Sequence, residues 1–421
     1  MKNNLLALKI FSLLIYILPI ALITGSFLPD FIISFAGILF IFLTIKYKEY
    51  DYYKNIFFIF FFVFFFFLLL SSLFSINKFF SFQTSLTYIR FGILSLIVLF
   101  CIENNQEFLK NFRNIIFITI SVLVVDSYIQ LIFDHNLLGF YRNDPRRLSG
   151  LFGNRYILGT FLLKISPILL YLFFIEKKKY QYFILFYFLI FIEPIIFFSG
   201  QRSIFYLSLI LIFNFYIFIR IDKKVMFASF VIFLMLFLTL KYNKTYNERM
   251  IGDVISNFKF DTTISESNDL NKKILNFSIF SPIHTSLYLT SLNMFEDKKI
   301  IGQGPKMFRM LCDQYKVNEM GCSTHPHNYY MQALSELGLV GILFLAIFYI
   351  SLLYFYFKIF ITRFAENVKK VANCKIFIII GLLIVYFPLS PHGDFFNNWN
   401  NILNYLLIGF LINKNKTNYE Y

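Results

Sequence analysis

The side chains best suited to acid–base chemistry lie in one short stretch of this chain. Residues 322–330 read Cys-Ser-Thr-His-Pro-His-Asn-Tyr-Tyr. A neutral imidazole accepts a proton from a hydroxyl group, which makes His327 a candidate general base. His325 and Asn328 stand beside it and are candidate substrate ligands. We therefore expect a reactive site within this stretch.

The spacing in this stretch predicts a helix with Pro326 in its first turn, a position that suits proline. The helix dipole would then disfavour a positive charge on His327 and keep its imidazole neutral. Asn328, Gln332 and Glu336 follow at spacings of four residues, so they would share one helix face. The alternative is a capping histidine in an interfacial polar turn.

Two other segments carry polar groups that could join such a site. Residues 300–309 read Ile-Ile-Gly-Gln-Gly-Pro-Lys-Met-Phe-Arg, which lacks the third glycine of a dinucleotide-binding fingerprint. We interpret this segment as a rigid turn that fixes Arg309. His284 opens the amphipathic stretch Ser286–Phe295 and is a further candidate ligand, although a lone histidine is more often structural.

Cys312 and Cys322 precede the histidine stretch. They could form a disulfide in an oxidising compartment, or they could be two buried free thiols. The spacing of Cys and His residues resembles no zinc site, so we expect no metal.

These segments must be positioned by helices that cross a membrane. The hydrophobic fraction is 58%, and charged residues make up 15%, against about 25% in an ordinary soluble domain. Apolar runs of roughly 17 to 22 residues, the length that a bilayer core requires, occupy most of the chain. We predict an all-α polytopic membrane protein with about twelve spanning helices, because in lipid an open chain satisfies its backbone only as helices. The predicted spans are Leu5–Leu28, Phe31–Ile45, Ile56–Ser75, Thr84–Ile102, Ile115–Phe133, Tyr156–Ile175, Tyr182–Phe198, Ile204–Ile219, Val225–Leu240, Leu334–Phe360, Ile376–Leu389 and Ile402–Ile412.

Lysine and arginine residues indicate the orientation, because they favour cytoplasmic loops. With the N-terminus inside, the basic loops alternate consistently and both termini lie in the cytoplasm. The basic residues of the inner connections and tail are Lys46, Lys48, Lys54, Lys110, Arg113, Lys177, Lys178, Lys179, Arg220, Lys223, Lys224, Arg363, Lys369, Lys370, Lys375, Lys414 and Lys416. The net charge of +15 is therefore a topology signal rather than a nucleic-acid surface. The segment Lys241–Tyr330 falls outside and is too long for an idle connector.

A few charges oppose this rule. The outer arginines are Arg142, Arg146, Arg147 and Arg155 after the fifth span and Arg202 in the turn Ser-Gly-Gln-Arg after the seventh. They need a reason other than insertion, although a tight loop can hold an arginine for solubility. Lys164 is a rare charge within a span, and it either faces the protein interior or snorkels to the interface.

The chain divides into three predicted parts. Residues 1–240 form an N-terminal transmembrane bundle of about nine helices, and residues 334–421 form about three more. Residues 241–333 form a large periplasmic loop between them.

Three motifs together resemble the O-antigen ligase and O-antigen polymerase superfamily: the turn Ser-Gly-Gln-Arg, the segment Gly-x-Gly-Pro-Lys-x-Phe-Arg and the segment Thr-His-Pro-His-Asn-x-Tyr-x-Gln. The resemblance is strongest from Arg202 to Gly341. It implies a GT-C-like glycosyltransferase of the bacterial inner membrane that needs neither metal nor cofactor. Such enzymes move a glycan from an undecaprenyl-diphosphate carrier to an acceptor at the periplasmic face. Ligases use lipid A-core as the acceptor, and polymerases use another carrier-linked repeat unit.

The resemblance also assigns roles by position. His327 matches the essential loop histidine, which would deprotonate the acceptor hydroxyl. Arg202 matches the arginine of the outer turn, which would hold the diphosphate, since guanidinium groups bind phosphate bidentately. The arginines that could assist it are Arg146, Arg147 and Arg309. Many relatives have an arginine where this chain has His284, so the role of that residue departs from the pattern.

We favour ligation to lipid A-core, with polysaccharide polymerisation as the alternative. A lipid-linked glycan flippase or another transporter is the rival of a different class. Twelve spans fit a transporter, but transporters place polar groups near the bilayer midplane, whereas this chain gathers them at one face.

Overall fold

The computed structural model of the protein describes residues 5–176, 178–219, 222–252, 255, 280–365 and 374–413. Within these residues the regular elements are helices, and one isolated β-bridge joins His135 and Tyr141. The predicted all-α class is confirmed for this part of the chain. Outside the described residues lie residues 256–279 of the predicted outer loop, both chain ends, and the predicted inner residues Lys177, Arg220, Lys369, Lys370, Lys414 and Lys416.

Every predicted span corresponds to one helical stretch. The stretches are α1 (Leu5–Thr24), α2 (Phe27–Lys46), α3 (Ile56–Leu73), α4 (Lys78–Asn104), α5 (Phe108–Phe133), α6 (Leu158–Phe174), α7 (Lys178–Tyr187) joined to α8 (Glu193–Phe198), α9 (Arg202–Phe218), α10 (Lys223–Tyr242), α16 (Tyr329–Ala365), α17 (Ile376–Val385) and α18 (Asn398–Leu411). Eight of these are long and apolar enough to cross a membrane, and α6, α9 and α17 are shorter apolar helices. The remaining one is α18, whose first turn is rich in asparagine. The protein is therefore a multi-pass membrane protein.

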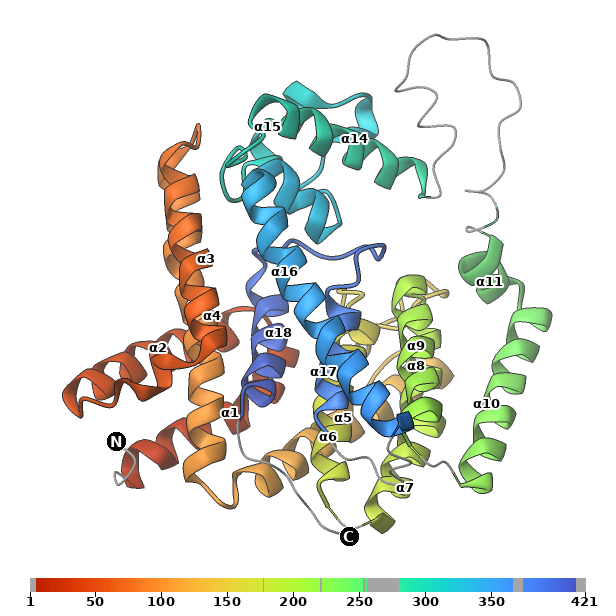
Figure 1. Cartoon of the computed structure of the whole chain (residues 1–421). Helices are drawn as coiled ribbons and strands as arrows, with labels where there is room; N and C mark the ends of the chain where they lie inside the picture. The colour runs from red at the N-terminus through yellow and green to blue at the C-terminus, as the bar shows by residue number, and fades with distance from the viewer. Residues whose placement is uncertain are drawn as a thin grey trace.

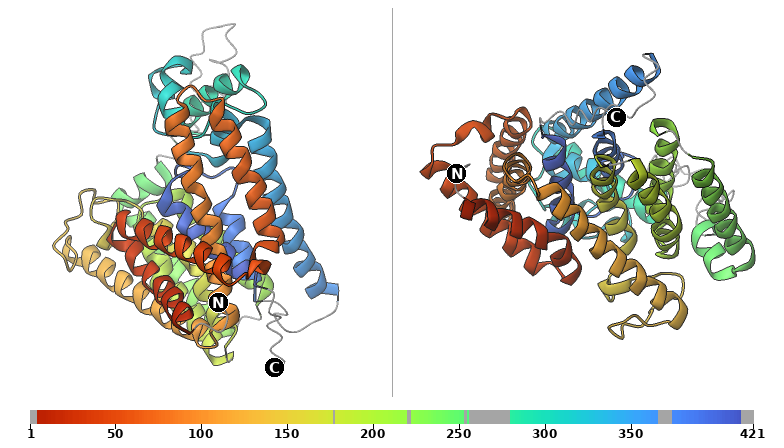
Figure 2. Two further views of the ribbon diagram at one scale, coloured as in Figure 1. Left: turned by 90° about the vertical axis from the view of Figure 1, so that its left-hand side faces the viewer. Right: turned by 90° about the horizontal axis from the view of Figure 1, so that it is seen from below.

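Further short helices follow the last helix of the N-terminal bundle. They are α11 (Lys244–Asn247), α14 (Pro282–Asp297) and α15 (Phe308–Tyr315). Helices α14 and α15 form a cap at one end of the bundle, and α3, α4 and the start of α16 rise side by side to meet it (Figures 1 and 2). The cap has a small core of its own, in which Leu287, Met294 and Phe308 are buried.

The last two helices are embedded among the earlier ones. Gly409 of α18 lies so close to α4 that an added Cβ would be 2.6 Å from Val98, and Gly381 of α17 is similarly close to Pro167 of α6. These glycines let the helix backbones approach closely, which is how membrane helices commonly pack. The C-terminal helices thus share one core with the N-terminal bundle.

Helix α16 contains a kink at Gly338, where the backbone has φ 63° and ψ −157°. The predicted span Leu334–Phe360 is therefore preceded by a short separate helix that begins at Tyr329. The backbone N–H of Leu339 donates to the carbonyl of Lys299 at 2.8 Å, so the kink is tied to the outer segment. An added Cβ at Gly338 would lie 2.5 Å from the carbonyl oxygen of Ile300, so only glycine fits here.

Candidate functional site

The helix that follows the histidine stretch begins at Tyr329, so the predicted start at Pro326 is wrong. Asn328 caps it instead. Its Oδ1 accepts hydrogen bonds from the backbone N–H groups of Tyr330 at 2.9 Å and Met331 at 3.1 Å. An asparagine side chain can satisfy these otherwise unpaired donors, which a proline cannot do.

The amide of Asn328 is also bound from the other side. Its Nδ2 donates to the carbonyls of Pro388 at 2.7 Å and Ser390 at 3.2 Å, and the side chain is buried. Two accepted and two donated bonds use the full capacity of a carboxamide. We therefore assign Asn328 to positioning rather than to the substrate binding that its sequence position suggested.

Three histidine rings lie together at the cap end of the bundle. The ring centroids of His325 and His327 are 4.1 Å apart, and those of His284 and His327 are 5.9 Å apart. His284 comes from the first turn of α14, where its Nδ1 lies 2.6 Å from Oγ of the capping residue Ser281. The structure thus joins residues that are about forty positions apart in the sequence.

Burial keeps these imidazoles neutral. It lowers the pKa of His284 to about 4, with smaller contributions from the nearby His327 and Arg202. It likewise lowers the pKa of His325 to about 4 and the pKa of His327 below its usual range. His327 precedes the helix with φ 57°, so desolvation rather than a helix dipole accounts for its neutrality.

Arg202 reaches the same cluster from another helix. It is the first residue of α9, directly after the turn that ends α8. Its charge lies near enough to His284 to oppose protonation of that ring. An arginine and three neutral imidazoles therefore converge from α9, α14 and the segment before α16.

The connection between α17 and α18 forms the floor of this cluster, a feature that we did not anticipate from the sequence. The backbone N–H of His392 donates to the carbonyl of His327 at 2.8 Å. The carboxylate of Asp394 accepts from Nε2 of Gln332 at 2.8 Å and from Arg309 at 2.9 Å. The run Ser-Pro-His-Gly-Asp at 390–394, polar and rich in turn residues between two apolar helices, is the signal that could have revealed it.

Arg309 was expected to help Arg202 to hold the diphosphate. In the structure its guanidinium instead forms an ion pair with the carboxylate of Asp394. The segment that carries it is a rigid turn, as predicted. The backbone N–H of Gly304 donates to the carbonyl of Glu336 at 2.8 Å, and the Glu336 carboxylate accepts from the N–H of Phe308 at 2.9 Å. Gln332 also donates to Glu336 at 3.0 Å, so the predicted polar stripe lies on one helix face.

Below the floor lies a second buried polar group of residues. The ring of His392 stacks on Tyr329 with centroids 4.3 Å apart, and burial lowers the pKa of His392 to about 3. Lys164 points into the interior and donates to Oδ1 of Asn400 at 2.9 Å and of Asn404 at 3.2 Å. Its head group does not snorkel to the membrane interface, so the first alternative is confirmed.

Arg146 and Arg147 lie against the arginine turn. The guanidinium of Arg146 makes two hydrogen bonds to the carboxylate of Asp144, at 3.0 and 3.1 Å. The guanidinium of Arg147 stacks over Tyr156, 4.0 Å from the ring centroid. An added Cβ at Gly200 would lie 2.4 Å from the carbonyl oxygen of Arg146, so the loop and the turn are in contact.

A further arginine joins this region without having been predicted. Nε of Arg249, which follows α11, donates to the carbonyl of Gly200 at 3.0 Å. Arg142 forms an ion pair with Asp134, and Arg155 is exposed. The outer arginines therefore divide into a group around Gly200 and two residues outside it.

Comparison with known proteins bears on the segment that carries these groups. Residues 183–346 match the family model described as O-antigen ligase. Over these residues the chain is similar to the O-antigen ligase family. No curated protein matches the chain. The O-antigen ligase match supports glycan transfer of the ligase or polymerase type.

The O-antigen ligase segment contains Arg202, His284 and His327 but ends before the floor. His392 and Asp394 lie beyond its last matched residue. The domain also includes Cys312 and Cys322, which the structure joins in a disulfide beside the cap core. Among the described residues, no group of three His, Cys, Asp or Glu side chains could hold a metal ion.

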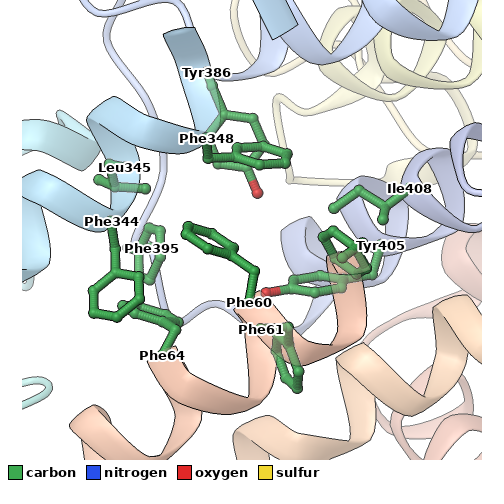
Figure 3. A pocket seen from close by; sticks show the side chains of 11 residues that line it. Phe60, Phe61, Phe64, Phe344, Leu345, Phe348, Tyr386, Phe395, Tyr405 and Ile408 are labelled. Carbon is green, nitrogen blue, oxygen red and sulfur yellow. The ribbon is translucent and has the colours of Figure 1, made fainter. Parts of the chain in front are cut away.

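An aromatic pocket lies beside the floor of the histidine cluster, between α3, α16 and α18 (Figure 3). Its labelled side chains are Phe60, Phe61, Phe64, Phe344, Leu345, Phe348, Tyr386, Phe395, Tyr405 and Ile408. Phe57, Phe60 and Phe348 also line an apolar cavity of about 940 Å³ toward the opposite membrane face. The aromatic pocket is also lined by Phe395, the neighbour of Asp394.

Proposed function

We propose that this protein transfers a glycan from an undecaprenyl-diphosphate carrier to lipid A-core at the periplasmic face of the inner membrane. Polymerisation onto a second carrier-linked repeat unit is the alternative, since it requires the same donor and the same chemistry. The observation that carries the proposal is the convergence of Arg202 with the neutral His284 and His327 within an O-antigen ligase domain.

The reaction follows from these groups. His327 accepts the proton of the acceptor hydroxyl as its oxygen attacks the anomeric carbon of the donor. The bond from that carbon to the diphosphate oxygen breaks, and the diphosphate leaves with the bonding electrons. Diphosphate is a stable anion, so its departure requires charge stabilisation rather than a metal or a second acid.

Guanidinium groups provide that stabilisation. Arg202 lies beside the histidine cluster, and Arg146 and Arg147 lie against the turn that holds it. A guanidinium keeps its charge at any physiological pH and offers paired donors that match two phosphate oxygens. We assign Arg309 to holding Asp394 instead, because its guanidinium already binds that carboxylate.

Two features support a lipid-linked donor and an outward-facing site. The cavity of about 940 Å³, with its largely apolar lining, suits a long hydrocarbon chain within the membrane. The Cys312–Cys322 disulfide suits an oxidising compartment such as the periplasm.

The test is deletion of the gene in its native host, followed by analysis of lipopolysaccharide and of the carrier-linked glycan. Loss of capped lipopolysaccharide, with long polymer accumulating on undecaprenyl diphosphate, is the expected result for a ligase. Lipopolysaccharide capped with a single repeat unit would identify a polymerase. Two unchanged pools would overturn glycan transfer of either kind.

A variant then tests the assigned base. His327→Ala should reduce transfer in reconstituted membranes by about 10²–10⁴-fold, the usual contribution of a general base. His135→Ala is the matched control, because His135 is an exposed histidine of another outer loop. Full activity of His327→Ala would refute the assignment.

A further inference from the structure

A polar pocket of about 310 Å³ opens beside α4, on the side of the membrane that carries the cap. Its walls come from three places: the first half of α4, the glycine turn before α15, and the start of α18. The polar residues that line it are Gln83, Thr84, Thr87, Arg90, Lys306 and Asn398. This volume lies at the small end of the range of ligand pockets, roughly 300–1,000 Å³.

The pocket explains a charge that the membrane would otherwise disfavour. Arg90 lies within the spanning helix α4, and charges within spans face protein or water and mark functional sites. Gln83 and Thr87 precede it by seven and three residues, so the three side chains share one face of the helix. That face borders the pocket.

Arg90 is held in place by the N-terminal turns of α2. Its guanidinium donates to Oγ of Ser34 at 3.0 Å and lies 3.4 Å from the carboxylate of Asp30. Nδ2 of Asn398 donates to the same carboxylate. The buried Nε of Arg90 has no hydrogen-bond partner among the described groups. The pocket thus has a fixed cation in its wall.

Lys306 supplies a second cation. It forms no ion pair with a carboxylate of the described residues, and Asp30 is the acidic group whose charge it influences. Two cations with one carboxylate leave an excess positive charge at the pocket. An anionic group on a ligand would balance it.

The remaining lining suits a sugar ring. Phe80 supplies partly exposed aromatic surface, against which the C–H face of a pyranose can pack, while the rings of Tyr88, Phe91 and Phe396 are buried behind the lining. Amide and hydroxyl groups both donate and accept hydrogen bonds, as sugar hydroxyls require. Hydroxyl-rich ligands with one negative charge therefore match the pocket in polarity, shape and charge.

Hydrogen bonds link the walls of the pocket to the floor of the histidine cluster. Lys306 belongs to the glycine turn that is bonded to Glu336, and Phe396 donates its backbone N–H to Asp394 at 3.0 Å. Asp394 in turn binds Arg309 and Gln332 at the floor of the cluster. The pocket is therefore connected through Asp394 to the floor of the histidine cluster.

We propose that this pocket binds the acceptor saccharide through a phosphate or carboxylate group held between Arg90 and Lys306. The inference rests on the proposed glycan transfer and adds an acceptor subsite to it. The acidic saccharide could belong to lipid A-core or to a carrier-linked repeat unit, and the two sources are separable by experiment.

The test uses Lys306→Gln and Thr87→Val in the full-length protein, reconstituted in lipid and supplied with donor. Each variant should raise the KM for the acceptor by about tenfold and leave kcat and the KM for the donor within twofold of wild type. Lys299→Gln is the matched control, because Lys299 is an exposed lysine of the same outer segment outside the pocket. An unchanged acceptor KM in both pocket variants, with normal transfer by wild type, would overturn the pocket while leaving the proposed function intact.

Two acceptors identify the source of the saccharide. A phosphorylated core oligosaccharide on lipid A should show the KM effect in a ligase, and a carrier-linked single repeat unit should show it in a polymerase. Binding of the same core oligosaccharide without donor, measured by calorimetry in nanodiscs, should weaken in Lys306→Gln and not in Lys299→Gln. Failure of wild type to transfer glycan to either acceptor would refute the proposed function itself.

Discussion

Crowding of the three imidazoles controls how many protons the site can hold. The charge that His327 would acquire opposes protonation of both His284 and His325. The carboxylate of Asp394 favours a proton on His325, although burial outweighs that effect. The cluster can thus hold one proton taken from a substrate. A second proton would create another positive charge beside the first in a partly buried environment, which is unfavourable.

The lowered pKa values predict an unusual pH dependence. A base works while neutral, and burial keeps His327 neutral below the ordinary histidine pKa of about 6.5. As pH falls, transfer should therefore persist through pH 6.5 and be lost only at lower pH, when the ring is protonated. The acid limb of kcat/KM for transfer in proteoliposomes measures this directly. A limb centred above pH 6.5 would contradict the burial of the base.

Asn328 gives a prediction of a different kind, because its side chain serves the fold. Asn328→Ala removes the cap of α16 and the donor to the carbonyls of Pro388 and Ser390. It should lower the free energy of unfolding by about 0.5–2 kcal/mol for the cap alone. Thermal unfolding in detergent checks this, with Asn143→Ala, at an exposed outer asparagine, as the control. Loss of glycan transfer without loss of stability would instead support the original prediction that Asn328 binds the substrate.

Among the elements, α16 links the site to the membrane. Its kink at Gly338 separates a short helix that carries Gln332 and Glu336 from the long apolar span. The outer segment 299–304 fits into the kink and is bonded on both sides of it. The direction of the short helix is therefore set by this segment and not by the membrane span.

Gly338→Ala tests the kink. An added Cβ would combine a positive φ with a contact of 2.5 Å to the carbonyl oxygen of Ile300. Gly139→Ala has a positive φ too, but its Cβ would meet nothing within 4 Å, so it reports backbone strain alone, about 1–3 kcal/mol. Gly338→Ala should destabilise the protein more than Gly139→Ala in thermal unfolding and should also reduce transfer. Equal destabilisation by the two substitutions would mean that the backbone at the kink shifts to accommodate the added Cβ.

The elements also show what the sequence could predict. The helices were predictable because a run of apolar residues determines a span locally. The reactive stretch was found because two histidines at a membrane boundary are conspicuous in composition. The floor was not found, since the bonds from His392 to His327 and from Asp394 to Gln332 join residues more than sixty positions apart and leave no local pattern. The helix start was misplaced because asparagine capping prevailed over the preference of proline for a first turn.

For the molecule as a whole, the two ends of the bundle are expected to face different compartments. The disulfide and the cap lie at one end of the bundle. The lysine and arginine residues gathered at the opposite end predict that this end faces the cytoplasm. A membrane-impermeant maleimide should label Lys299→Cys in intact inner-membrane vesicles of native orientation and spare Lys46→Cys until the membrane is opened. The reverse pattern would invert the orientation and remove the proposed periplasmic site.

The position of the floor near the end of the chain has a consequence for biosynthesis. A membrane protein is inserted from its N-terminus, so every residue of the O-antigen ligase segment emerges before residues 388–397 are made. Until that connection folds under the histidines, His327 lacks its partner at His392 and Arg309 lacks Asp394. A chain that stalls before α18 would display all the matched motifs without the floor, so synthesis through α18 is itself a condition for the proposed activity.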